Sequence, residues 1–220
     1  MTPERSIERT RDRVLADGVF LAVRLPDAAG VVDACRAAAR GGLRVLEITL
    51  TTPGALDVIR ELAGQEDLVT GAGTVLTVEE ARAVAEAGGV FAMSPVFVPE
   101  MVDEIHRLGL LAVPGAASPT EILAAHRRGA RLVKVFPAGP LGGPEFLRTV
   151  RGPLPDIPLV PTSGPTSDTI AEYVAAGAVA VGVGGEVFGK GFTLESVEAA
   201  ARRLRAAMSA ARASAAPTRL

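Results

Sequence analysis

The chain has 220 residues, of which 48% are hydrophobic and 22% charged, and its formal net charge is −2. This length and composition are typical of one globular domain and exclude a disordered or fibrous chain. The small net charge, without a basic block, argues against nucleic acid as a partner. We also expect no membrane partner, because no apolar run approaches the roughly 20 residues that span a bilayer, and no signal-peptide core follows the charged N-terminus.

One cysteine and two histidines limit the chemistry that the chain offers. Cys35 is the single cysteine, so an intrachain disulfide cannot form, which favours a reducing, cytoplasmic location. His106 and His126 both fall in predicted helices and lack the spacing of metal ligands. We therefore predict no metal site and no other cofactor.

Short apolar runs alternate with alanine-rich amphipathic stretches along the chain, which is typical of repeated βα units and a parallel sheet. A leading helix is predicted over residues 3–16. Strands are predicted over residues 19–24, 43–49, 68–73, 90–94, 110–114, 131–136, 157–161 and 179–183. Helices are predicted at about 27–41, 53–64, 77–88, 98–108, 118–128, 143–151, 166–176 and 193–213.

Eight strands, each followed by a helix, predict a single domain over residues 1–220. We expect an α/β fold, a closed (β/α)8 TIM barrel with an extra N-terminal helix. An open doubly wound sheet is the alternative, but it usually has a glycine-rich loop after its first strand, where this chain has Arg24-Leu25-Pro26-Asp27. The tail over about 209–220 is rich in alanine and serine and is expected to fray.

A lysine stands in the middle of the apolar run over residues 131–136. Leu132, Lys134 and Phe136 share one face of this predicted strand at a period of two. Lysine is seldom buried unless it is paired or used, and burial disfavours the charged ammonium. Lys134 is therefore a candidate nucleophile for an imine (Schiff base); the alternative is an ammonium group that reaches solvent at the strand end.

A carboxylate interrupts a second strand that is otherwise apolar. Glu47 shares a face with Thr49 and Thr51, and a buried carboxylate is costly unless it is paired or hydrogen-bonded. Glu47 is either a general acid and base beside Lys134, with a pKa raised by burial, or a structural ion-pair partner of Arg24 or Lys134.

Other candidate binding residues follow the ends of the predicted strands, where such barrels carry out chemistry. Arg24 has the planar guanidinium that holds a carboxylate by two hydrogen bonds, and Thr74 offers a hydroxyl to the same group. Glycine-rich turns follow the last two strands and have backbone amides suited to an anion. The predicted binding residues are Arg24, Thr49, Thr74, Pro95, Phe136, Ser163, Gly164, Gly184 and Gly185.

Six sequence motifs occur in the order seen in a known family. They are Leu46-Glu47-Ile48-Thr49-Leu50, Gly71-Ala72-Gly73-Thr74-Val75-Leu76, Ser94-Pro95, Pro114-Gly115 with Ser118-Pro119-Thr120-Glu121, Val133-Lys134-Val135-Phe136-Pro137-Ala138, and Pro161-Thr162-Ser163-Gly164. From about Val19 to Phe188 the chain resembles the 2-keto-3-deoxy-6-phosphogluconate (KDPG) aldolases, which overlap with the 4-hydroxy-2-oxoglutarate (KHG) aldolases.

The resemblance implies a class I lyase, trimeric, that splits a 2-keto-4-hydroxy acid into pyruvate and an aldehyde. Lys134 would form the Schiff base, Glu47 would move protons, and Thr74 would help to hold the pyruvate carboxylate. The backbone around Ser163-Gly164 and Gly184-Gly185 would hold the distal phosphate. An iminium ion on the lysine withdraws electrons from the breaking bond, so this chemistry needs no metal.

Three residues depart from the family pattern. Thr51 stands where well-known members have an arginine that grips the substrate carboxylate, and we expect Arg24 to take its place. Glu186 stands where the pattern has a small polar residue that helps to bind phosphate, and Ser163 replaces a usual glycine. Glu186 either points into the site and repels phosphate, or points outward and leaves the backbone amides free.

Three functions therefore remain open at this point. The first is the aldolase, acting on a small-molecule keto acid as a homotrimer. The second is a phosphosugar isomerase or epimerase on the same fold, with Glu47 as the base and Lys134 as an electrostatic partner. The third is a non-catalytic protein that binds sugar acids, which the departures at Thr51 and Glu186 favour.

Overall fold

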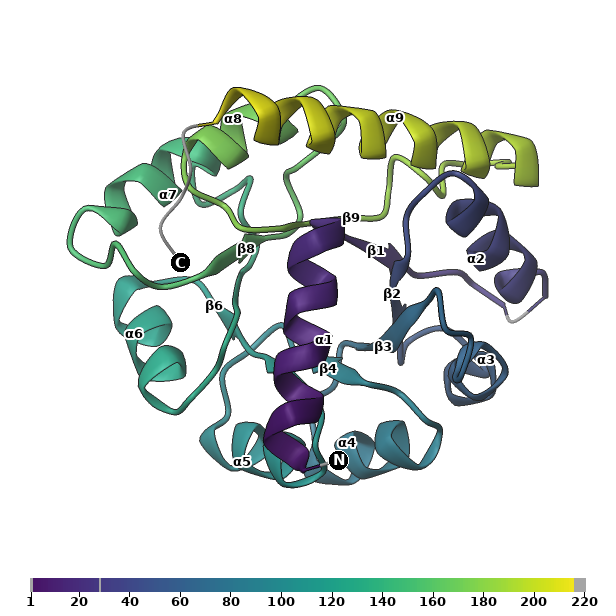
Figure 1. Cartoon of the computed structure of the whole chain (residues 1–220), viewed down its shortest axis with the longest axis horizontal. Helices are drawn as coiled ribbons and strands as arrows, with labels where there is room; N and C mark the ends of the chain where they lie inside the picture. The colour runs from purple at the N-terminus through teal and green to yellow at the C-terminus, as the bar shows by residue number, and fades with distance from the viewer. Residues whose placement is uncertain (1, 28, 216–220) are drawn as a thin grey trace.

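Strands and helices alternate along the chain in the computed structural model, which describes residues 2–27 and 29–215 (Figure 1). The strands are β1 (Val19–Val23), β2 (Val45–Thr49), β3 (Val69–Gly73), β4 (Phe91–Met93), β5 (Leu111–Val113), β6 (Gly115–Ala116), β7 (Val133–Val135), β8 (Leu159–Pro161) and β9 (Val181–Val183). The helices are α1 (Pro3–Asp17), α2 (Val31–Arg40), α3 (Ala55–Leu62), α4 (Val78–Glu86), α5 (Pro99–Arg107), α6 (Pro119–Arg127), α7 (Gly143–Arg151), α8 (Ile170–Ala175) and α9 (Leu194–Ser214).

The strands form two parallel sheets, so the prediction of one closed eight-stranded barrel is wrong. The larger sheet is curled and has six strands in the order β5-β4-β3-β2-β1-β9; the smaller has the order β6-β7-β8. The strand predicted over 110–114 ends at Val113, before Pro114, which lacks an N–H group, and the chain after Pro114 pairs with β7 instead of β4. At the other junction, β8 and β9 are joined only by isolated bridges at Leu159–Ala178 and Thr162–Gly182.

Two buried clusters follow from the period of two along each strand. The larger lies between the sheets and the helices that surround them (Figure 1). The smaller fills the inside of the curled sheets and includes Phe20, Val45, Phe91 and Leu132. Because these residues lie near the amino ends of their strands, the inside is apolar at that end. Two positions further along β2 and β7 the same faces carry Glu47 and Lys134.

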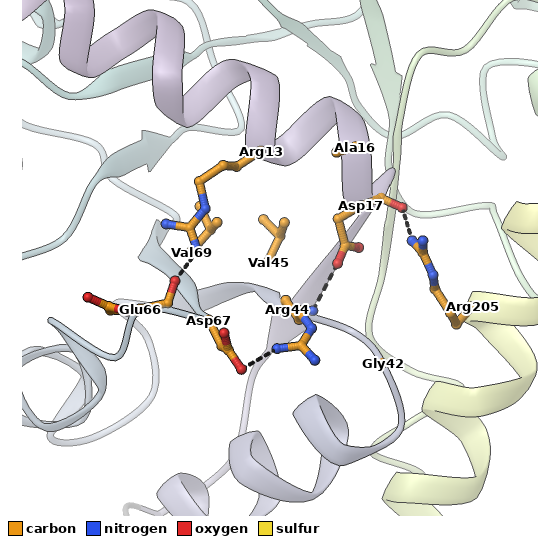
Figure 2. Close-up of a pocket in the computed structure, with 10 residues that line it drawn as sticks. All are labelled: Arg13, Ala16, Asp17, Gly42, Arg44, Val45, Glu66, Asp67, Val69 and Arg205. Carbon is orange, nitrogen blue, oxygen red and sulfur yellow. Dashed lines mark hydrogen bonds and ion pairs between the residues drawn. The ribbon is translucent and has the colours of Figure 1, made fainter.

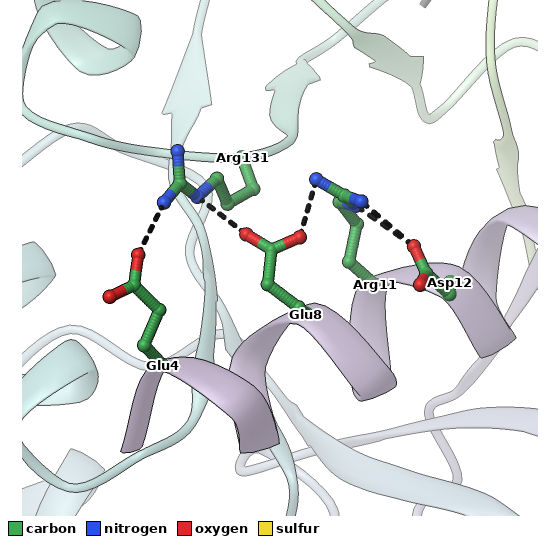
Figure 3. Close-up of polar contacts among 5 residues, drawn as sticks. All are labelled: Glu4, Glu8, Arg11, Asp12 and Arg131. Atoms are coloured by element: carbon green, nitrogen blue, oxygen red, sulfur yellow. Dashed lines mark hydrogen bonds and ion pairs between the residues drawn. The ribbon is translucent and has the colours of Figure 1, made fainter. Parts of the chain in front are cut away.

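Helix α1 lies across the amino ends of the strands (Figure 1) and closes the apolar interior there. Its Ile7 and Val14 belong to the interior cluster. Its Glu4 and Glu8 pair with Arg131, which lies just before β7 (Figure 3). The sequence predicted this helix but gave no indication of where it docks.

Helix α9 packs against α2 and α8 and continues to Ser214, so part of the tail that was expected to fray is helical. The rest of that prediction, residues 216–220, lies outside the described residues. Within residues 2–27 and 29–215, no helix combines the length and apolar character needed to cross a membrane.

Candidate active site

Lys134 and Glu47 face each other across the interior, and they come from different sheets. Lys134 is the middle residue of β7 in the smaller sheet, and Glu47 is the middle residue of β2 in the larger one. Lys134 Nζ lies 3.6 Å from Glu47 Oε1, and their side chains are 9% and 3% exposed. This separation exceeds a direct hydrogen bond, so an oxygen atom bound beside the two groups could contact both.

Small neighbours leave room for this pair. Thr49 and Gly73 are partners in the β2–β3 ladder, and a Cβ atom on Gly73 would lie only 2.1 Å from Glu47 Oε1. On the other side, the ammonium group of Lys134 lies 5.3 Å from the centre of the Phe136 ring, within the range of a cation–π contact. Gly73 is therefore part of the site, because its lack of a side chain gives the carboxylate of Glu47 its space.

A cavity of about 600 Å³ opens beside this pair. Seven of the residues predicted for the site line it: Arg24, Glu47, Lys134, Phe136, Ser163, Gly184 and Gly185. The structure does not place Thr49, Thr74, Pro95 or Gly164 in its wall. Thr49 is buried and donates its hydroxyl to the Val23 carbonyl oxygen at 3.1 Å, which gives it a structural contact between β1 and β2.

Arg24 extends from the end of β1 across the mouth of the cavity toward the neighbouring strands. Its Nη1 donates to Thr51 Oγ1 at 2.5 Å, and its Nη2 donates to Thr74 Oγ1 at 3.0 Å. Thr74 has a φ of 59°, a strained value for a β-branched residue. The structure thus brings together Arg24 and Thr74, which the sequence connected with carboxylate binding, and Thr51, which stands where the family pattern has arginine.

The far side of the cavity is built from the turns after β8 and β9. Ser163 has a φ of 62°, and its carbonyl oxygen accepts a hydrogen bond from Gly139 N at 2.8 Å. Gly164 packs so closely against Tyr173 that a Cβ atom there would lie 2.4 Å from the phenol oxygen. Glu186 Oε1 accepts from Ser167 Oγ at 2.5 Å and Glu186 Oε2 from Ser167 N at 2.7 Å.

Thr162 was not among the predicted site residues, yet it lines the cavity. It is 6% exposed, and its hydroxyl is buried without a hydrogen-bond partner within the described part of the chain. Ala22, Val183 and Phe188 also line the cavity without having been predicted. Ala22 and Val183 lie two residues before Arg24 and Gly185, but apolar and small residues at such positions look like core residues in a sequence.

A second cavity, of about 570 Å³, lies at the opposite end of the strands and is lined by Arg13, Arg44 and Arg205 (Figure 2). These charges already have partners. Arg13 donates to the Glu66 and Leu68 carbonyl oxygens, Arg44 pairs with Asp67, and Arg205 donates to the Asp17 carbonyl oxygen. We therefore place the candidate chemistry at the cavity of Lys134 and Glu47.

Burial raises the pKa of the Asp17 carboxyl beside this second cavity above its usual value. The backbone N–H groups of Val19 and Arg44 donate to its two oxygens and oppose that shift. These contacts join the end of α1 to the starts of β1 and β2, which gives Asp17 a structural role.

Comparison with known proteins connects this geometry to a family. A model described as KDPG and KHG aldolase matches residues 12–201. The 2-dehydro-3-deoxy-phosphogluconate aldolase of Treponema pallidum is 39% identical over 165 residues, which cover 74% of this chain and 77% of the relative.

Two solved structures are similar along most of their length. The 2-keto-3-deoxy-6-phosphogluconate aldolase of Zymomonas mobilis ZM4 with 3-phosphoglycerate has a TM-score of 0.84 at 26% identity, covering 91% of this chain and 96% of that one. The KDPG aldolase of Legionella pneumophila, with pyruvate captured as a covalent carbinolamine intermediate, has a TM-score of 0.80 at 26% identity, covering 93% and 98%. The resemblance seen in the sequence is confirmed: this chain belongs to the family of KDPG and KHG aldolases.

Proposed function

We propose that this protein is a class I aldolase that cleaves a 2-keto-3-deoxy sugar acid to pyruvate and an aldehyde through an imine on Lys134. The observation that carries the proposal is the Lys134–Glu47 pair, 3.6 Å apart and almost fully buried beside a cavity. The family assignment supports the same reaction, and the Legionella relative holds pyruvate as a carbinolamine.

The amine of Lys134 attacks the C2 carbonyl carbon and forms a carbinolamine, which loses water to give an iminium ion. A carboxylate beside the amine then takes the proton of the C4 hydroxyl while the C3–C4 bond breaks. The bond electrons move into the iminium group and leave an enamine, and the aldehyde departs. Protonation at C3 and addition of water release pyruvate and restore the amine. Glu47 is the one acidic side chain among the described residues that line the cavity, so we assign these proton transfers to it.

We assign the carboxylate of the substrate to Arg24. Its guanidinium is held at the cavity mouth by Thr51 and Thr74, which supports a role in orienting the keto acid. Ser163, Gly184 and Gly185 line the end of the cavity formed by the last two strands, where we place the distal end of the substrate. The cytoplasmic location stays a prediction from the single cysteine.

We also propose that the protein is a homotrimer, as the family resemblance implies. Leu76 and Val96 follow β3 and β4, which are neighbours in the larger sheet, and they are 49% and 46% exposed. Exposed apolar side chains on adjacent loops support an interface between copies at this place.

Imine trapping tests the proposed function. Lys134 and Lys190 are the only two lysines in the chain, so the site of a covalent adduct is easily assigned. Borohydride reduction in the presence of pyruvate should add one reduced pyruvyl group to Lys134, located by peptide mass spectrometry. The Lys190→Arg variant should be trapped equally well and Lys134→Met should not. An isomerase or a binding protein would give no adduct on Lys134, and that result would overturn the proposal.

A further inference from the structure

A fixed carboxylate of the protein lies next in the chain to the glycines that line the distal end of the cavity. Gly184 and Gly185 line the cavity, and Glu186 is the next residue in the chain. Both oxygens of Glu186 accept hydrogen bonds from Ser167, one from its hydroxyl at 2.5 Å and one from its backbone N–H at 2.7 Å. Two hydrogen bonds to one residue fix the carboxylate in place between the turns after β8 and β9.

These contacts use the donors that an incoming anion would need. A phosphate group is bound by N–H and O–H donors on turns of this kind. Here the amide and the hydroxyl of Ser167 are already occupied by Glu186, so the protein supplies its own anion at this position.

At the distal end, none of the described residues that line the cavity has a basic side chain. Among the described residues that line the cavity, the basic ones are Arg24 and Lys134. Arg24 is bound to Thr51 and Thr74 at the ends of β2 and β3, and Lys134 is the proposed nucleophile, so both belong to the keto-acid end. A dianion beyond Gly184 would therefore approach the carboxylate of Glu186, and no basic residue that lines the cavity would pair with it there.

We propose that Glu186 makes this protein selective for a 2-keto-3-deoxy acid whose distal end is an uncharged hydroxyl rather than a phosphate. The inference rests on the proposed function and narrows its substrate class. It sets the chain apart from the Treponema relative, which is named as a phosphogluconate aldolase, and from the Zymomonas relative, which was solved with 3-phosphoglycerate. Selectivity then comes from a repulsive group built into the site.

The test compares kcat/KM for 2-keto-3-deoxygluconate and for its 6-phosphate. We expect the wild-type protein to prefer the unphosphorylated acid by about tenfold or more, and Glu186→Gln to shift the ratio toward the phosphate by about tenfold, because one unfavourable charge contact is removed. Glu172→Gln removes the same charge from an exposed position on α8 and should leave the ratio as it is.

Two outcomes would overturn the inference. One is a wild-type preference for the 6-phosphate. The other is an equal loss of activity on both substrates in Glu186→Gln and in Ser167→Ala, which would mean that the contact only positions the two turns. Imine trapping with pyruvate involves no distal group, so it separates these outcomes from a failure of the proposed function. A protein that traps pyruvate on Lys134 and prefers the phosphate refutes the selectivity alone.

Discussion

Arg24 is exposed, yet its guanidinium has two fixed partners from two other strands. From the sequence we expected Arg24 to take the place of the arginine that the family pattern has at position 51, and its guanidinium does lie against Thr51. The hydroxyl groups of Thr51 and Thr74 set the direction of the guanidinium and leave part of its fork free for a ligand.

Arg24→Ala should therefore weaken binding of the keto acid much more than it slows the chemical step. Loss of a charged, two-pronged contact costs about 2–3 kcal/mol, so KM for the substrate should rise by roughly 30- to 150-fold with a smaller change in kcat. Arg24→Lys keeps the positive charge but loses the planar guanidinium, so its KM should lie between those of the wild-type protein and Arg24→Ala. Steady-state kinetics give both parameters, and an unchanged KM in Arg24→Ala would rule out this role.

Gly73 tests the position of Glu47 without changing either proposed catalytic group. In Gly73→Ala the new methyl group would collide with Glu47 Oε1, so the carboxylate must move away from Lys134. We expect kcat to fall by roughly 100-fold, the lower range for loss of general acid–base catalysis. A Cβ atom on Gly189 would meet nothing within 4 Å, which makes Gly189→Ala the matched control. Equal kcat values in the two variants would show that the space at Gly73 is not needed.

At the scale of single elements, the turn after β8 is strained at Ser163, which has a positive φ without being glycine. Glycine adopts this conformation without the steric cost that a Cβ atom brings. Ser163→Gly should therefore raise the free energy of unfolding by about 0.5–1 kcal/mol, less than the full steric term because glycine also gains freedom in the unfolded chain. Urea unfolding with an unchanged m-value measures it, and a less stable Ser163→Gly protein would contradict this interpretation.

Helix α1 is held mainly by its apolar face. Val14 is fully buried in the interior cluster, whereas Arg131 and its partner Glu8 keep 44% and 32% of their side-chain surface exposed. Val14→Ala should lower the free energy of unfolding by about 2 kcal/mol, and Arg131→Ala by less than about 1 kcal/mol. Urea denaturation of both variants shows which substitution lowers the free energy of unfolding more. The reverse order would mean that the ion pairs in Figure 3 dock the helix.

Local elements were predictable from the sequence because their signals are local. The helix predicted over about 77–88 begins after Thr77, whose side chain forms a capping box with Glu80, and α7 spans the predicted residues 143–151. The alternation of strands and helices placed Glu47 and Lys134 on inward faces for the same reason.

Other features depend on contacts between distant segments and could not be predicted. Whether neighbouring strands pair into one continuous ladder depends on the distances between all the strands of the sheet. Here the ladder is interrupted at Pro114 and between β8 and β9. The direction of the Glu186 side chain depends on Ser167, which is 19 residues away in the chain. Threonine is common at strand ends, so the sequence could not predict that the hydroxyl of Thr162 is buried without a hydrogen-bond partner among the described residues.

At the scale of the whole molecule, the proposed trimer predicts a specific effect of surface charge. Leu76→Asp should lower the mass measured by light scattering to that of a single chain, because a buried, unpaired carboxylate destabilises an interface. Leu194→Asp is the control, since Leu194 is 40% exposed on α9, away from β3 and β4. If Leu76→Asp and the wild-type protein have the same mass, the interface lies elsewhere or does not form.

Because the strands form two sheets, the proposed acid, Glu47, and the proposed amine nucleophile, Lys134, belong to different sheets. Neither sheet contains both groups, so a chain in which only the larger sheet has formed should have no aldolase activity. Recovery of catalytic activity during refolding would then report the time at which the two sheets come together, rather than the earlier formation of either sheet.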